Sequence, residues 1–182
     1  MRKRNLGMGL LVLLFVFSNI SYLSAEVDFG VGVDYLVPAD HRLEQGVGYS
    51  FYMKFGFNEY LSYGIMFCQN SLTGEEDGAT VVLERSEYLF SLWYELTKFL
   101  YLRVGAGGGR IIVSSGSGIN DTKILSEFGL GYQKVNKGKI TSKLYVEVGY
   151  KLQSANQDYF DSGNLVTNLG GVSFRVGASV GF

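Results

Sequence analysis

The final stretch of the chain, 172–182, alternates between two kinds of side chain. Apolar residues occupy every second position from Val172 to Phe182, and Ser, Arg or Gly occupies each position between them. A period of two places one kind of residue on each face of a β-strand. The alternation therefore predicts a C-terminal strand with one apolar face and one face of small and polar residues.

Seven earlier segments carry the same alternation, which predicts eight strands in all. We expect the earlier strands at 27–38, 46–57, 61–68, 82–96, 100–109, 122–133 and 140–152. The connections at 58–59, 97–98 and 135–139 are short, whereas those at 38–45, 70–80, 114–121 and 154–168 are longer and polar. Short and long connections therefore alternate along the chain.

The composition fits short apolar strands better than long apolar helices. Hydrophobic residues make up 47% of the chain, which holds 25 Gly, 13 Phe and 13 Tyr but one Pro. Aromatic residues stand near both ends of most apolar faces, such as Tyr49 and Phe57 on one strand or Phe174 and Phe182 on another. Two aromatic girdles around an aliphatic band are typical of a membrane barrel. The alternative, a soluble barrel or β-sandwich, would bury the apolar face and expose the charged one.

The N-terminus has the three parts of a secretory signal peptide. Basic residues at 2–4 precede an apolar core at 10–17, and a polar stretch ends at Ala25. We expect cleavage after Ala25, which leaves a domain at 26–182 with 13 basic and 17 acidic residues, a formal net charge of −4. That balance gives no reason to expect nucleic acid as a partner. The single Cys68 excludes an intramolecular disulfide.

An alternating terminal strand that ends in Phe resembles the C-terminal β-signal of bacterial outer-membrane barrel proteins. From 26 to 182 the chain resembles the small eight-stranded barrels of the OmpA-transmembrane and OmpX type, without a periplasmic peptidoglycan-binding domain after the barrel. The resemblance implies an all-β, antiparallel, up-and-down transmembrane β-barrel in the outer membrane of a Gram-negative-type bacterium. It places both termini in the periplasm and four longer loops at the cell surface. The residues that match the assembly signal are Phe174, Val176, Ala178, Val180 and Phe182.

The inner face of such a barrel would hold charged residues of both signs. An eight-stranded barrel is only wide enough for side chains to fill its interior, so these charges must pair with one another. We interpret the set as a self-neutralising structural plug, and a gated or proton-conducting path is the alternative. The ten residues are Asp34, Lys54, Glu87, Glu95, Arg103, Glu127, Lys143, Glu147, Lys151 and Arg175.

Residues that could carry catalysis or bind ligands are few. His41 is the only histidine, and it could act as a base for Ser71 or Ser154 in a lipid-modifying reaction, but no motif supports this. The loop acids lack calcium-loop spacing, so we predict no metal and no cofactor. Tyr159 and Phe160, in the longest outer loop, are the best candidates for contact with a partner.

By likeness, we predict a non-enzymatic barrel that contributes to envelope integrity and presents its loops for surface interaction. Its expected partners are outer-membrane lipids and lipopolysaccharide, the barrel assembly machinery and an unknown surface ligand. A narrow gated channel for small solutes or ions is the second hypothesis, and a lipopolysaccharide-modifying enzyme is the third.

Overall fold

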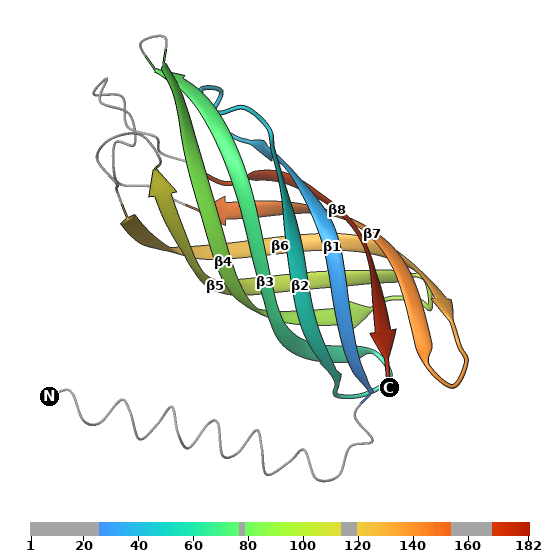
Figure 1. Cartoon of the computed structure of the whole chain (residues 1–182). Coiled ribbons are helices and arrows are strands. Elements are labelled where there is room, and N and C mark those ends of the chain that lie inside the picture. The colour runs from blue at the N-terminus through green and yellow to red at the C-terminus, as the bar shows by residue number, and fades with distance from the viewer. Residues whose placement is uncertain (1–25, 77–78, 114–119, 154–168) are drawn as a thin grey trace, which may run out of the picture.

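Eight antiparallel strands follow one another around a closed barrel in the computed structural model (Figure 1). The structure describes residues 26–76, 79–113, 120–153 and 169–182. The strands are β1 (Val27–Pro38), β2 (Gly46–Gly56), β3 (Leu61–Glu76), β4 (Ala79–Glu95), β5 (Leu100–Val113), β6 (Asn120–Asn136), β7 (Thr141–Gln153) and β8 (Gly171–Gly181). This arrangement confirms the predicted all-β, eight-stranded, up-and-down fold. The described residues contain no helix long and apolar enough to cross a membrane.

The barrel closes where the first strand meets the last. β1 pairs with β8 in antiparallel register from Asp28 opposite Gly181 to Pro38 opposite Gly171. Beyond that ladder, the Val27 N–H donates to the Phe182 carbonyl at 3.2 Å, and the Phe182 N–H donates to the Val27 carbonyl at 3.1 Å. The C-terminal residue therefore belongs to the seam, which removes the free edges that an open sheet would leave.

Three tight turns and the C-terminus share one end of the barrel, which we call the turn end (Figure 1). The Asn58 side chain accepts hydrogen bonds from the N–H groups of Tyr60, at 2.9 Å, and Leu61, at 2.8 Å. In the next turn, the Thr97 hydroxyl accepts from Phe99 and Leu100 at 3.2 and 3.0 Å. Such side-chain bonds replace backbone partners and tighten a turn. The opposite end is called the loop end.

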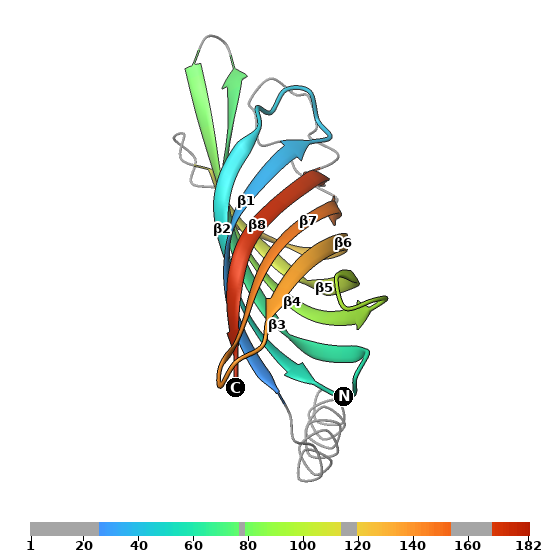
Figure 2. The same ribbon diagram turned by 90° about the vertical axis from the view of Figure 1, so that its right-hand side faces the viewer.

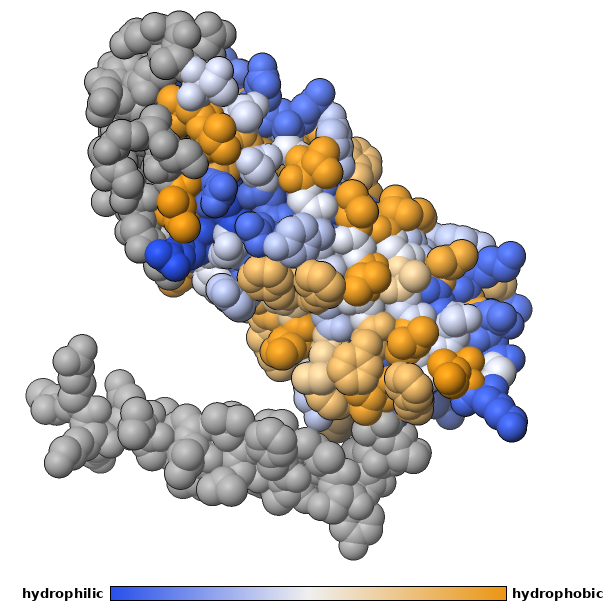
Figure 3. Space-filling view, viewed as in Figure 1, coloured by the Kyte–Doolittle hydropathy of each residue, from blue (hydrophilic) through white to orange (hydrophobic). Residues whose placement is uncertain are grey.

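Apolar side chains cover the outside of the barrel along the membrane band, and the buried charged side chains lie inside. Val33 and Val176 are 60% exposed, whereas Asp34 and Arg175, their neighbours in sequence, are almost fully buried. In the space-filling view, an apolar band crosses the molecule between two more polar ends (Figure 3). Because a soluble barrel would bury this band, the surface is that of a membrane-spanning barrel.

The segment at 70–80 corrects one sequence prediction, because most of it is strand and not loop. β3 continues to Glu76 and β4 begins at Ala79, so the two form a hairpin that projects at the loop end (Figure 2). Here Leu72 and Leu83 face inward and are buried, while Ser71 faces outward. The apolar and polar faces are therefore exchanged relative to the membrane band. The sequence prediction assumed that the apolar residues of every strand face outward, so it assigned this segment to a polar loop.

Candidate functional site in the barrel interior

The ten charged residues predicted for the inner face all lie on that side of the barrel wall. Nine of them are buried, and the side chain of Glu95 keeps 25% exposure near the turn end. Sequence reasoning left two further members out of the set, Asp28 and Arg85, which are 1% and 0% exposed. Strand parity would have found both, since Asp28 shares a face with Asp34 and Arg85 with Glu87. With them, the set comprises six acidic and six basic residues among those that the structure describes.

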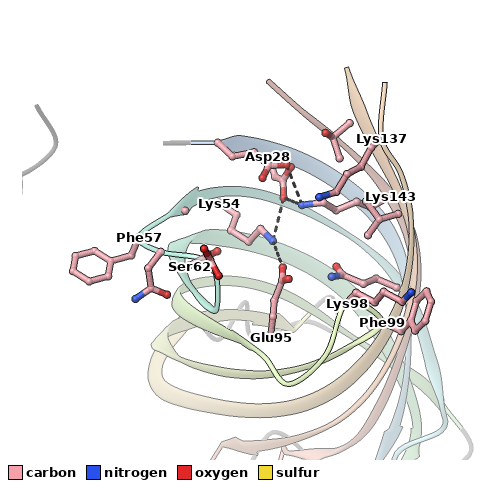
Figure 4. Close-up of a pocket in the computed structure, with 16 residues that line it drawn as sticks. Asp28, Lys54, Phe57, Ser62, Glu95, Lys98, Phe99, Lys137 and Lys143 are labelled. Carbon is pink, nitrogen blue, oxygen red and sulfur yellow. Dashed lines mark hydrogen bonds and ion pairs between the residues drawn. The ribbon is translucent and has the colours of Figure 1, made fainter. Parts of the chain in front are cut away.

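The turn end of the lumen is an open mouth with an ion-pair network on its wall (Figure 4). The cavity has a volume of ≈ 1030 Å³. Asp28 is the centre of the ion-pair network, with Oδ2 at 2.6 Å from Lys143 Nζ and 3.1 Å from Lys54 Nζ. Lys54 also reaches Glu95 at 3.8 Å, and Lys143 reaches the half-exposed Glu26 at 3.5 Å. Each lysine therefore shares Asp28 and has a second carboxylate nearby.

Above the mouth, four aromatic side chains form a collar across the lumen: Tyr52, Trp93, Tyr101 and Tyr145. Tyr52 packs against Trp93 with ring centroids 5.7 Å apart and against Tyr145 at 5.8 Å. These rings separate the open mouth from the centre of the barrel.

Each tyrosine of the collar lies over a glycine on the neighbouring strand. The cross-strand pairs are Tyr52 with Gly30, Tyr101 with Gly131 and Tyr145 with Gly177. A Cβ atom built at any of the three glycines would overlap the tyrosine ring. The glycine content of the inner face is therefore explained in part by the space that these rings need.

The centre of the lumen is a layer of two arginines and three carboxylates. Arg175 donates to Asp34 through Nε at 2.5 Å and to Glu147 through Nη1 at 2.8 Å. Arg103 Nη2 lies 2.8 Å from Glu147 Oε1 and 2.8 Å from Glu127 Oε1. All five side chains are almost completely buried. Because each arginine bridges two carboxylates and Glu147 contacts both arginines, removal of one arginine would weaken the pairing of more than one buried charge.

A second ionic cluster lies toward the loop end. Glu87 accepts from Arg85 and, at 2.6 Å, from Lys151 Nζ. Arg85 also donates to Gln153 Oε1 and to the Leu169 carbonyl, both at 2.7 Å. Arg85, on the inner face of β4, thus holds the segment before β8 in place through the Leu169 carbonyl.

An apolar cluster closes the lumen beyond these charges, and we call it the seal. Its members are 0–6% exposed: Leu36, Leu43, Leu72, Val81, Leu83, Ile111 and Leu169. They come from the inner faces of four strands and from the segments beside them. The described lumen is therefore open at the turn end and closed by apolar packing at the loop end.

Similar solved structures exist, although no family model matches the chain and no curated protein matches it. The crystal structure of Ail, the attachment invasion locus protein of Yersinia pestis, is 15% identical, covers 87% of this chain and 97% of that one, and has a TM-score of 0.53. The structure of Ail, an outer membrane protein, in a phospholipid bilayer nanodisc gives 12% identity, 87% and 100% coverage and a TM-score of 0.54. For the outer membrane protein OprG of Pseudomonas aeruginosa, the values are 7%, 87%, 96% and 0.52. The chain has the fold of a small outer-membrane β-barrel.

The catalytic candidates among the described residues form no hydrogen-bonded pair. His41 is exposed in the β1–β2 connection, and no hydrogen bond joins it to Ser71 in the described part of the chain. In the same connection, the Arg42 side chain donates to Asp40 and lowers the pKa of that carboxyl. Cys68 is buried in the barrel, 3.5 Å from Arg175 Nη2. It is thus a packed interior residue without access to solvent.

Other candidates fall outside the described residues or form no cluster. Ser154, Tyr159 and Phe160 all lie outside the described ranges, so the last two stay predictions of the sequence. Among the residues that are described, no group of three or more His, Cys, Asp or Glu side chains could hold a metal ion. The candidate site that the described residues do form is the interior of the barrel, with its ionic, aromatic and apolar layers.

Proposed function

We propose that the protein is a non-enzymatic barrel of the outer membrane of a Gram-negative-type bacterium that contributes to envelope integrity and meets partners through its loop end. The observation that carries this proposal is the β3–β4 hairpin, which extends past the apolar band. Along 79–82 of β4, no described strand pairs on the side away from β3. A strand edge of this kind accepts an extended segment of another chain through main-chain hydrogen bonds.

The net charge at the loop end indicates which kind of partner surface would bind there. The segments 39–45, 70–84, 110–123 and 154–168 hold nine acidic residues and three basic ones, a formal net charge of 3 − 9 = −6. A neutral or basic surface therefore suits this end better than a polyanion. Ail has been crystallised with the heparin analogue sucrose octasulfate. For this chain we expect the opposite preference, with weak binding to sulfated glycans.

The experiment that tests membrane orientation compares two single-cysteine probes. Thr80→Cys marks the hairpin and Glu59→Cys marks a tight turn, and both positions are exposed. We expect a membrane-impermeant maleimide to label Thr80→Cys in intact cells and Glu59→Cys only after the envelope is opened. The parent protein is the control, because its Cys68 is buried. Labelling of Glu59→Cys alone in intact cells would reverse the orientation, and labelling of neither variant in lysed cells would contradict a folded surface barrel.

A narrow gated channel is the second candidate, and the open mouth with its buried charges favours it. The collar and the seal oppose it, because a continuous water path would have to cross both. We expect no reproducible conductance steps in planar bilayers from the refolded protein. Steps that changed with Glu127→Gln or Arg103→Gln would establish the channel. A lipopolysaccharide-modifying activity ranks third, and an altered lipid A acyl pattern on expression would be needed to support it.

The proposed partners also include the barrel assembly machinery. The residues of the expected assembly signal, from Phe174 to Phe182, lie on the outer face of β8 and at the seam. Replacement of Phe182 is expected to slow assembly in cells more than it lowers the stability of the refolded barrel. Unchanged assembly in cells would remove this part of the proposal.

A further inference from the structure

Four lysines gather at the turn end, on the side of the barrel formed by β4 to β7. Lys98 lies in the β4–β5 turn, Lys134 near the end of β6, and Lys137 and Lys139 in the β6–β7 turn. All four are exposed, and together we call them the lysine rim. A hydrogen bond from the Gln133 N–H to the Phe99 carbonyl, 2.7 Å long, joins β6 to the β4–β5 turn and holds the two parts of the rim together.

No acidic residue lies next to the lysine rim along the chain, and the exposed acids that also border the mouth, Glu26 and Glu59, lie before β1 and in the β2–β3 turn. The sequence contains no Asp or Glu at 96–120 or at 128–146. Glu95, just before the first of these ranges, faces the lumen and contacts Lys54. Lys143 also faces the lumen, where Asp28 holds it. Within the described ranges, none of the four rim lysines forms an ion pair with a carboxylate.

Aromatic rings connect the lysine rim to the membrane-facing surface. Lys98 Nζ lies 4.7 Å from the centroid of the Phe99 ring. The Phe99 ring stacks on Tyr132, with centroids 6.0 Å apart and an angle of 22° between the rings. Lys134 lies two residues beyond Tyr132 on the same outward face of β6. Exposed tyrosine marks the level where a membrane barrel meets the lipid headgroups, and lysine beside it extends its charge to that level.

We propose that the lysine rim binds the headgroups of anionic phospholipids in the leaflet at the turn end. Lysines close to a membrane surface attract anionic lipids, and the attraction adds up over several residues. Three features favour a lipid over a soluble partner. The rim lies at the turn-end edge of the apolar band, and Lys134 faces outward from a strand. The aromatic side chains of Phe99 and Tyr132 lie between the rim and the membrane-facing surface. Lys98 and Lys137 also border the mouth of the lumen, so a headgroup at the rim would lie beside it (Figure 4). This inference rests on the proposed membrane orientation.

The test measures lipid selectivity with spin-labelled phospholipids in vesicles that contain the refolded protein. We expect labelled phosphatidylglycerol to be retained at the protein on the order of tenfold more strongly than labelled phosphatidylcholine. High salt should reduce the preference, because the interaction is electrostatic. The variant Lys98→Gln/Lys134→Gln/Lys137→Gln/Lys139→Gln should bring the ratio close to one. The matched variant with arginine at the same four positions should keep it.

Several outcomes would overturn the inference. Equal retention of the two lipids by the parent protein would do so, as would a preference that survives in the glutamine variant or is lost in the arginine variant. Heat-modifiable migration on a detergent gel is measured on every sample, since a folded barrel migrates differently before and after boiling. A folded, correctly oriented barrel without selectivity contradicts the lysine rim alone, whereas failure of the cysteine-labelling experiment contradicts the proposed orientation.

Discussion

The projecting part of β3 and β4 and the membrane band carry their apolar side chains on opposite faces of the sheet, although the same strands run through both. In the band, Ile65 and Phe90 face outward and are more than half exposed. In the projecting part, Leu72 and Leu83 face inward and are completely buried, while Glu84 points outward. Backbone pairing continues unchanged from one part to the other. The difference therefore lies in the solvent around the sheet and not in its geometry.

The position of the exchange indicates where lipid contact ends. On β3, the outward residues change from Phe67 to Gln69 and Ser71, and on β4 they change from Tyr88 to Ser86 and Glu84. Past this level water solvates the outer face, so apolar side chains gain by packing inside. The seal is thus the small core of a water-exposed structure, placed on top of an ionic lumen that the membrane surrounds.

The largest effect is expected from a change in the ionic centre of the band. Arg175→Met leaves the buried Asp34 without its arginine and leaves Glu147 with Arg103 alone. Removing one partner of a buried ion pair costs about 3–5 kcal/mol of unfolding free energy. Denaturant unfolding in lipid vesicles measures the loss, and neutralising both carboxylates in Arg175→Met/Asp34→Asn/Glu147→Gln should restore much of it. A loss under about 1 kcal/mol would indicate that water solvates this layer.

A matched pair of lysine substitutions tests the comparison directly. Val176 faces outward midway along β8, paired with Val33 and Val146, whereas Val82 faces outward in the projecting part. We expect Val176→Lys to cost about 2–4 kcal/mol, because a charge then lies near the middle of the bilayer, and Val82→Lys to cost about 0–1 kcal/mol. The same unfolding experiment measures both. Equal costs would mean that the two surfaces meet the same solvent.

The sequence contains most of the information about the wall of the barrel and less about its interior. Strand parity and the alternation of short and long connections are local signals, and they predicted eight strands and the inward side of all ten charges. The length of β3 and β4 was missed, because the rule that apolar residues face outward holds only where lipid is present. Which charges pair depends on contacts such as Lys143 with Asp28, which lie 115 residues apart. Those contacts follow from barrel closure and register, and no local pattern encodes them.

A smaller effect is expected in the aromatic collar. Gly131 has the Tyr101 ring across it, and a Cβ atom there would overlap the ring. Since the ring is packed inside the lumen, Gly131→Ala should cost about 1–3 kcal/mol of unfolding free energy, the usual cost of overpacking. Gly138→Ala is the control, because the nearest atom to a Cβ atom there is 3.5 Å away. If the two variants had equal stability, the collar would be loose enough to move aside.

The smallest effect is expected at the mouth. Lys54→Gln removes one of two lysines from Asp28, which keeps Lys143 at 2.6 Å. Because the mouth is open to water, we expect a loss of about 1 kcal/mol or less, reduced further by salt. Lys54→Gln/Lys143→Gln should cost clearly more than the sum of the single changes, since Asp28 then lies buried without any cation. Unfolding at low and high salt measures both. Additive costs would show that water already solvates Asp28, so that the collar, and not the mouth, is where the dry interior begins.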